Sequence, residues 1–263
     1  MRKVKLIVMI GLVMSFAIGL VEAKEPLSTA QARKSVVKVA ILDTGSNIAY
    51  KEGISLIDDT VRDYNGHGTL IASIIKEACP GAELYVIKVI GKDGLALSEE
   101  AVILGLRWAI SRGVNIINMS LRLKDSERLH RAIREAFERE IIIIAAAGNL
   151  SSKADILNAP YRAGDGSPST AMSSREVAYP AKYPEVIAVG ALNRYGKIYE
   201  ASVRGNDVEI YCKGYKANKA GTSIAAAYAS GAIADIISKI PNFNVKELRR
   251  FIAQNGCLLM SRH

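Results

Sequence analysis

Residues 37–45 have the sequence VKVAILDTG, and this stretch decides the fold class. Every residue from 37 to 42 except Lys38 is apolar. A near-continuous apolar run of this length is typical of a strand that is buried on both faces of a parallel sheet. The stretch therefore predicts the first of several buried parallel strands. Runs of the same kind follow at 84–89, 115–119, 141–147 and 186–189.

Helical patterns lie between or after these runs. Ser98 has the side chain of a helix N-cap, and Glu99 and Glu100 follow in the first turn, where acidic side chains stabilise the helix dipole. The alternation predicts an α/β fold with a doubly wound, mainly parallel β-sheet and helices on both faces, in three layers. The expected helices cover 68–76, 98–112, 126–139, 222–238 and 245–254, and the fourth consists of small apolar residues that predict burial.

The first 23 residues have the pattern of a signal peptide. A basic start at 2–5 precedes an apolar run at 6–20, and Val21 and Ala23 suit the −3 and −1 positions of a cleavage site. The run is shorter than the ~20 residues that a membrane span needs, which favours cleavage over an uncleaved anchor. We therefore expect export to a periplasm or to the medium, with membrane contact only through an uncleaved leader.

Charge and cysteine content restrict the function classes. The chain of 263 residues has a formal net charge of +9, but its basic residues are scattered and form no nucleic-acid motif, so no nucleic-acid partner is expected. The spacing of the cysteines Cys79, Cys212 and Cys257 suits no zinc site. One disulfide or three thiols both remain open in an exported protein. No metal and no cofactor are expected.

Two residues in the first third of the chain suit acid–base chemistry. Asp43 ends the first strand, at the sheet edge where α/β proteins place their ligands, although a turn-capping role is the alternative. His67 stands in NGHGT (65–69) just before an apolar helix, a setting that suits a general base. His130 lies on a charged helix face and is expected to be exposed.

Two further motifs suit acyl transfer. Ser223 follows Gly221 at the start of a helix, where the dipole favours developing negative charge; a plain N-cap serine is the alternative. Asn149 follows the strand and glycine of AAAGN (145–149), from where its side chain can donate to a substrate oxygen; a turn asparagine is the alternative.

The order Asp43, His67, Asn149, Ser223 resembles the subtilisin-like serine peptidases. The segments LRWAI (106–110), VNIINMSL (114–121), YPAKYPEVIAVG (179–190) and PNFNV (241–245) extend the resemblance over residues 37 to 255. Together with the signal peptide predicted at 1–23, the resemblance gives a linker at 24–36 and a subtilisin-like peptidase domain at 37–263.

The family's mechanism implies a role for each candidate. Ser223 attacks the peptide carbonyl of a peptide or protein substrate, His67 carries the proton, Asp43 orients His67, and Asn149 with the Ser223 backbone N–H binds the oxyanion. The resemblance also implies that the substrate-binding residues are Ser120, Leu121, Arg122, Ala147 and Gly148. The small pocket walls favour an apolar substrate residue.

Several positions depart from the family. Ala227 replaces a proline four positions after the nucleophile, and we expect the helix to continue through it. Arg122 and Leu123 replace two glycines, which predicts a narrow cleft. A calcium loop is missing before Pro80, and 150–178 is a long connection. The 13 residues 24–36 are too few for a folding prodomain, so a separate folding helper or inhibitor is a candidate partner.

Three competing functions differ in their requirements. An aspartic peptidase would match ILDTGS (41–46), but its chemistry needs two carboxylates, and the sequence has no second such motif, so a homodimer would be required. A subtilisin fold that binds peptides or partners without cleaving them is the main alternative, favoured by the Arg122, Leu123 and Ala227 changes. A nucleotide-binding domain would need a glycine-rich phosphate loop, which the sequence lacks.

Overall fold

The computed structural model describes residues 36–94, 97–150, 176–240, 244–255 and 258–260. The predicted signal peptide, nearly all of the linker, most of the long connection after Asn149 and the side chain of Cys257 lie outside the described residues.

The centre of the fold is a parallel sheet with the strand order β10-β7-β6-β5-β4-β1-β3-β2. Its strands are β1 (Lys38–Asp43), β2 (Glu52–Ser55), β3 (Glu83–Lys88), β4 (Ile116–Met119), β5 (Ile142–Ala146), β6 (Val186–Leu192), β7 (Ile210–Lys213) and β10 (Leu258–Met260). A separate antiparallel hairpin is formed by β8 (Tyr215–Lys216) and β9 (Lys219–Ala220).

The order of the strands fixes where a ligand can bind. From β1 the chain reaches β3 on one side and then crosses to β4 on the other, so β1 and β4 are neighbours at which the winding direction changes. The carboxyl ends of two such strands diverge and leave a crevice, where open α/β sheets bind ligands.

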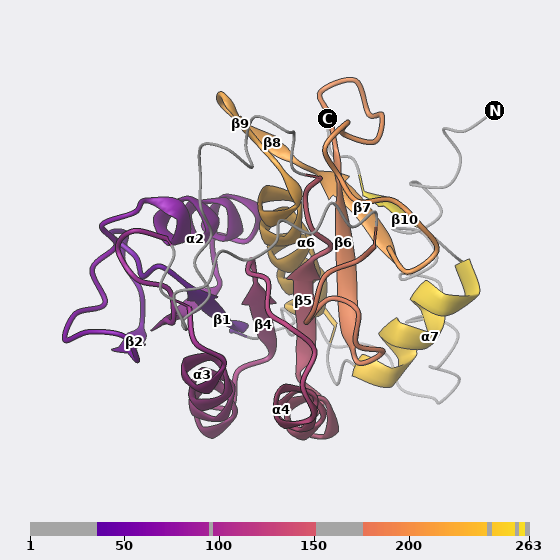
Figure 1. Cartoon of the computed structure of the whole chain (residues 1–263). Helices are drawn as coiled ribbons and strands as arrows, with labels where there is room; N and C mark the ends of the chain where they lie inside the picture. Colours follow the sequence, from indigo (N-terminus) through magenta and orange to yellow (C-terminus); the bar gives the residue numbers. More distant parts are fainter. Residues whose placement is uncertain (1–35, 95–96, 151–175, 241–243, 256–257, 261–263) are drawn as a thin grey trace, which may run out of the picture.

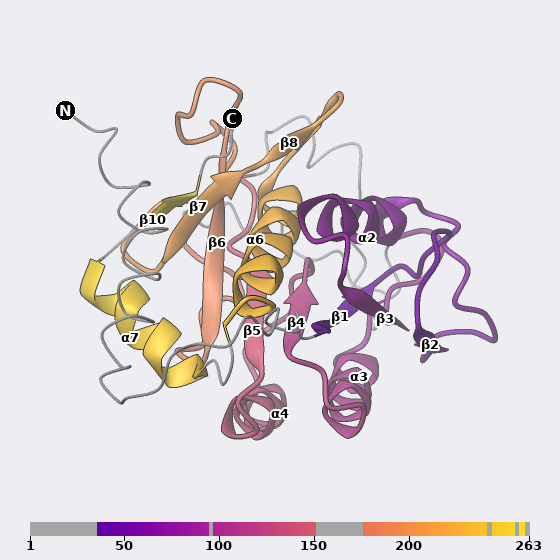
Figure 2. The ribbon, with the colours of Figure 1, turned by 180° about the vertical axis from the view of Figure 1, so that it is seen from behind.

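Helices cover both faces of the sheet (Figures 1 and 2). The helices α2 (His67–Ala78) and α6 (Thr222–Ile237) pack side by side on one face, and α3 (Glu99–Ser111) and α4 (Glu127–Glu138) lie on the other. The helix α7 (Val245–Asn255) begins with Val245 in the apolar cluster of the α2 and α6 face. The predicted three-layer arrangement is therefore confirmed.

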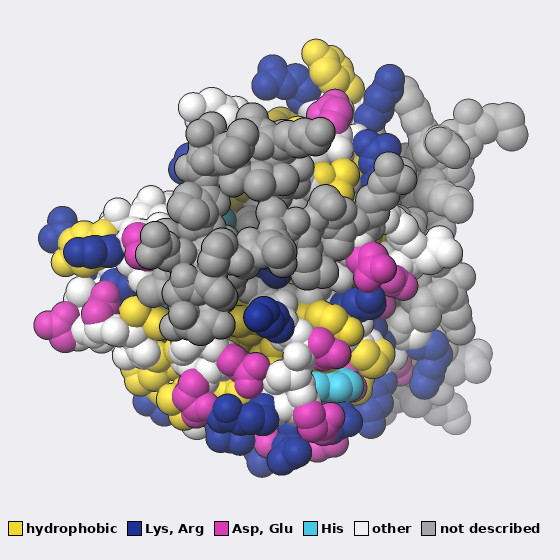
Figure 3. Space-filling model, viewed as in Figure 1, with side chains coloured by type: hydrophobic (Ala, Val, Ile, Leu, Met, Phe, Trp, Pro, Cys, Tyr) yellow, Lys and Arg dark blue, Asp and Glu magenta, His cyan; other side chains and the backbone are white. Residues whose placement is uncertain are grey.

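Alternate residues of β1 supply both cores. Val39 and Ile41 pack with α2 and α6, whereas Ala40 and Leu42 pack with α3 and α4. This alternation follows from the two-residue period of a strand and explains why the whole run is apolar. On the face that carries α3 and α4, basic and acidic side chains are intermixed at the surface (Figure 3).

The helix α6 is buried along most of its length, as its composition predicts. Ala227 is fully buried, and the helix continues through this position. A Cβ added to Gly231 would come within 2.5 Å of Ala78 Cβ, so the glycine permits the close approach of α2. In the described part of the chain, we find no helix with the length and apolar character of a membrane span.

The predicted elements agree with the structure to within about two residues, apart from the longer extent of β6. Ser98 caps α3 as expected, because its Oγ accepts a hydrogen bond of 3.0 Å from the Ala101 N–H. The sequence did not reveal β2, β7, β10 or the hairpin, whose strands are each only two to four residues long.

Candidate active site

Asp43 and His67 meet at the carboxyl end of β1. Asp43 is the last residue of β1 and His67 the first of α2, and Asp43 Oδ1 lies 2.8 Å from His67 Nδ1. Asp43 is fully buried, and its Oδ2 has no hydrogen-bond partner in the described part of the chain. The Thr44 N–H also donates to Asp43 Oδ1, at 2.8 Å. The negative charge of Asp43 raises the pKa of His67 above its usual range, although burial and Lys219 oppose the rise.

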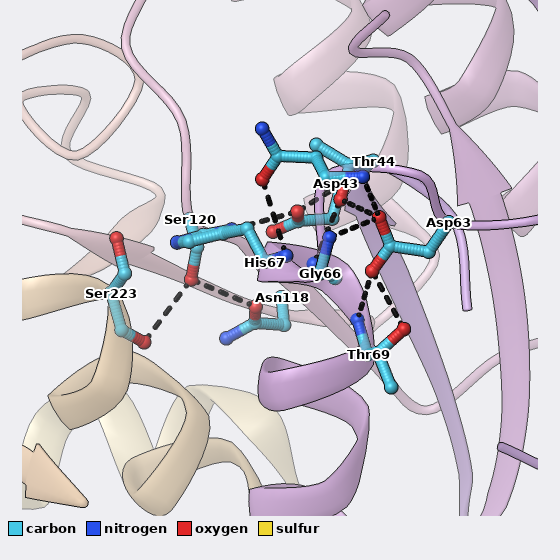
Figure 4. A network of polar contacts seen from close by, with 11 residues as sticks. Asp43, Thr44, Asp63, Gly66, His67, Thr69, Asn118, Ser120 and Ser223 are labelled. Carbon is cyan, nitrogen blue, oxygen red and sulfur yellow. Dashed lines mark hydrogen bonds and ion pairs between the residues drawn. The ribbon is translucent and has the colours of Figure 1, made fainter. Parts of the chain in front are cut away.

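The loop before His67 is held by a second carboxylate, Asp63 (Figure 4). Its Oδ1 accepts hydrogen bonds from Thr44 Oγ1 at 2.9 Å and from the backbone N–H groups of Asn65 and Gly66 at 3.0 and 2.7 Å. Its Oδ2 accepts from the N–H and hydroxyl of Thr69 at 2.8 and 2.6 Å. Asp63 thus connects the end of β1 to both sides of His67.

The ionisation of Asp63 follows from these contacts. Burial raises the pKa of the Asp63 carboxyl, but the hydrogen bonds from Thr69, Gly66 and Thr44 outweigh burial and bring the pKa below its ordinary value. The group is therefore a stable anion near neutral pH. Its charge also contributes to the raised pKa of His67.

Ser223 lies in the first turn of α6. This turn is at the end of the sheet where β1 ends. Ser120 lies directly after β4, and its Oγ is 3.2 Å from both the Ser223 carbonyl oxygen and Asn118 Oδ1, so these two acceptors share its single hydroxyl proton (Figure 4). Asn118 in turn donates to Ser230 Oγ at 2.9 Å inside α6. No hydrogen bond joins Ser223 Oγ to His67 in this part of the described structure; such catalytic bonds are often long until substrate is bound.

Asn149 is oriented by Thr222, the residue before Ser223. Asn149 Oδ1 accepts hydrogen bonds from the Thr222 N–H at 3.0 Å and the Thr222 hydroxyl at 3.2 Å. A backbone N–H can only donate, so the contact identifies the amide oxygen and makes Nδ2 the donor end of the side chain. The Gly148 N–H also donates to Thr222 Oγ1 at 3.2 Å. The segment 147–149 is thereby fixed against the start of α6.

The side chains at Arg122 and Leu123 occupy space beside this segment. A Cβ added to Gly148 would lie 2.8 Å from Arg122 Nη2, so the guanidinium rests against Gly148. The Leu123 N–H donates to the Tyr179 carbonyl at 2.9 Å, and Leu121 is buried in the core. Ala147 is also buried, and its carbonyl accepts a hydrogen bond from the Ala178 N–H at 2.9 Å.

A comparison of the sequence with family models identifies the family. The model of the subtilase family of peptidases matches residues 34–256. The chain belongs to the subtilase family. Among the curated relatives, this subtilase is 31% identical over 247 residues to Subtilisin DY of Bacillus licheniformis, with 84% of this chain and 83% of that protein covered. It is 32% identical over 257 residues to an intracellular serine protease of Paenibacillus polymyxa, with 85% and 73% covered.

Solved structures agree on the fold. A structure of a mutant of the protease domain of PatA matches this subtilase with a TM-score of 0.67 and 21% identity, covering 85% of this chain and 89% of that one. A lanthipeptide protease matches with a TM-score of 0.65 and 19% identity, covering 81% and 78%. The α/β architecture is therefore shared with proteins that are only 19–21% identical to this chain.

The structure brings all the predicted site residues to one end of the sheet, and it corrects one expectation. His130 is not exposed: it stacks on Tyr183 with ring centroids 4.3 Å apart and its Nε2 lies 3.0 Å from Glu185 Oε2. Cys79 and Cys212 are buried, and no disulfide joins them.

Asp63 was missed by the sequence analysis; its position two residues before Asn65 in a turn-rich stretch is the available signal.

Proposed function

We propose that this subtilase is a serine endopeptidase that cleaves through an acyl-enzyme on Ser223. The observation that carries the proposal is the contact between buried Asp43 and partly buried His67, with Oδ1 and Nδ1 2.8 Å apart, at the sheet end where α6 begins. A buried carboxylate fixes the tautomer in which Nδ1 carries the proton, so Nε2 is left as the base.

The proton and electron movements then follow the acyl-transfer scheme. Ser223 Oγ forms a bond to the peptide carbonyl carbon while its proton passes to His67 Nε2. The carbon–nitrogen bond breaks as His67 returns the proton to the leaving amine. Water then attacks the ester, giving its proton to His67, and the carboxylic acid leaves as Ser223 regains its hydroxyl proton.

The negative oxygen of each tetrahedral intermediate requires donors that are already in place. Asn149 suits this role because Thr222 binds its amide oxygen, so the Nδ2 group is the end that can donate to a substrate oxygen. The Ser223 backbone N–H, in the first turn of α6, is the second donor in the proposal. Donors fixed before the reaction stabilise the charge without reorganisation.

Hydrolysis of an unfolded protein substrate tests the proposal. The full chain is expected to cleave it, and Ser223→Ala is expected to abolish cleavage while the protein remains folded. Ser111→Ala is the matched control, because Ser111 is an exposed surface serine at the end of α3. Equal cleavage by wild type and Ser223→Ala would refute the nucleophile. Peptide binding without cleavage by folded wild type would support the peptide-binding alternative instead.

We also propose that the chain is exported and that residues 1–23 are removed. The support is the basic start, the apolar run and the Val21–Ala23 cleavage pattern of the sequence. The mass of the protein from a fractionated culture tests this: a mature chain beginning at Lys24 outside the cytoplasm is expected, and a full-length cytoplasmic chain would contradict it. A separate folding helper or inhibitor stays a prediction.

A further inference from the structure

Asn118 is a buried amide in an otherwise apolar part of the sheet. It lies in β4 between Ile41 of β1 and Ile144 of β5, and both isoleucines belong to the apolar cluster on the α2 and α6 face. The residue is fully buried. An amide that leaves water costs free energy unless its polar atoms are hydrogen-bonded, so both ends of the Asn118 side chain need partners.

Two serines supply these partners, one at each end of the amide. Asn118 Nδ2 donates to the Oγ of Ser230 at 2.9 Å, and Ser230 is itself fully buried in α6. Asn118 Oδ1 lies 3.2 Å from the Oγ of Ser120 (Figure 4). Because one end of an amide donates and the other accepts, the bond to Ser230 leaves the oxygen as the end that faces Ser120.

Ser120 continues this chain of contacts to the backbone of the nucleophile. Its Oγ is also 3.2 Å from the Ser223 carbonyl oxygen, so its hydroxyl proton is shared between that oxygen and the Asn118 amide. The carbonyl carbon of Ser223 is bonded to the Cα that carries both its N–H and its side chain. A contact that fixes the carbonyl therefore restrains the attacking Oγ and the proposed oxyanion donor together.

The spacing along α6 explains how Ser230 reaches this chain of contacts. Ser223 and Ser230 are seven residues apart, which is about two helical turns, so they lie on the same side of α6. Asn118 and Ser120 are two residues apart in extended chain, so their side chains point to the same side. The two pairs run alongside each other where α6 packs on β4.

We propose that Ser230 is a positioning residue for the reaction at Ser223, acting through Asn118 and Ser120. The inference rests on the proposed peptidase function. Without the Ser230 hydroxyl, Asn118 Nδ2 loses its partner, and the amide no longer holds the Ser120 hydroxyl in place. The backbone of the nucleophile then loses a restraint. Lost positioning slows the chemical step without weakening the binding of substrate.

Peptide hydrolysis by Ser230→Ala tests this role. We expect kcat to fall roughly 10- to 100-fold with little change in KM, and a fluorophosphonate to label Ser223 more slowly by a similar factor. Ser230→Cys keeps the size of the side chain but has sulfur as a weaker acceptor, so it should give a smaller loss of kcat. Ser238→Ala is the matched control and should leave kcat unchanged, because Ser238 is a buried serine at the far end of α6 whose Oγ donates to the Asp235 carbonyl at 2.8 Å.

A double-mutant cycle with Ser120→Ala separates positioning from a general loosening of α6. If Ser230 acts through Ser120, Ser230→Ala should cause no further loss of kcat in the Ser120→Ala background. Equal losses in both backgrounds, a loss confined to KM, the same loss in Ser238→Ala, or unchanged kcat in folded Ser230→Ala would overturn the inference, and the peptidase function would stand. Folded wild type that neither cleaves peptide nor reacts with the fluorophosphonate would overturn both proposals.

Discussion

Replacing Asp63 by asparagine removes the anion that organises the loop before His67. The retained side-chain oxygen can still face the donors of Thr44, Asn65 and Gly66, which meet Asp63 Oδ1. The new amide NH₂ must then face the Thr69 N–H, which in the wild type donates a hydrogen bond of 2.8 Å to Asp63 Oδ2. Two donors cannot form a hydrogen bond with each other, so the partly buried Thr69 N–H loses its partner.

The expected loss in the free energy of unfolding follows from these contacts. A buried donor left unsatisfied costs about 1–3 kcal/mol, and the remaining bonds weaken when the acceptor is neutral. We expect Asp63→Asn to lower the free energy of unfolding by about 2–4 kcal/mol at neutral pH. Asp59→Asn is the matched control, because Asp59 is an exposed residue of the same loop.

The effect should depend on pH with a defined sign. The pKa of Asp63 is lower in the folded protein, so its stabilisation is complete above the unfolded pKa of about 3.9 and is lost as the pH falls through the lower folded value. The difference between wild type and Asp63→Asn should therefore be largest near neutral pH and shrink in acid. Urea unfolding followed by Trp108 fluorescence measures it.

The same substitution should change catalysis. The charge of Asp63 helps to raise the pKa of His67, so Asp63→Asn should move the acid limb of the kcat/KM profile to lower pH. It should also reduce kcat, because the loop that holds His67 is loosened. Unchanged urea midpoints together with an unchanged acid limb would refute this account of Asp63.

Three further changes test separate parts of the structure. Lys219→Gln should move the acid limb of kcat/KM to higher pH, since the lysine opposes protonation of His67; a shift to lower pH would contradict this electrostatic role. Asn149→Ala should lower kcat by roughly 10²–10³ with little change in KM, measured on a peptide substrate, and a change confined to KM would argue against an oxyanion donor. Gly231→Ala should lower the free energy of unfolding by about 1–3 kcal/mol, because the new Cβ would come within 2.5 Å of Ala78 Cβ; equal stability in urea would show that α2 can move away.

The sequence predicts the strands that are buried on both faces, because burial demands continuous apolar residues. This holds for β1 and β5, whereas β2 at the sheet edge is only half buried and its residues Glu52–Ser55 carry no apolar run. Such an edge strand is defined by its hydrogen bonds to β3, which only the assembled sheet reveals.

The features of the candidate site also fall into two groups: those that the sequence indicates and those that only the structure reveals. Asp43, His67, Asn149 and Ser223 stand next to recognisable strand ends and helix starts, so their sequence positions indicate their meeting place. Contacts that join distant segments leave no local pattern. The hydrogen bond between Ser120 Oγ and the Ser223 carbonyl spans 103 positions, and the approach of Arg122 to Gly148 depends on a side-chain direction.

Intact-mass analysis after reaction with a fluorophosphonate tests the central claim most directly. The account predicts one adduct per folded chain, mapped by peptide sequencing to Ser223, and lost in both Ser223→Ala and His67→Ala but not in Ser111→Ala. Absence of an adduct on folded wild type, or an adduct that persists in Ser223→Ala, would contradict a nucleophile at the start of α6 activated by the Asp43–His67 pair.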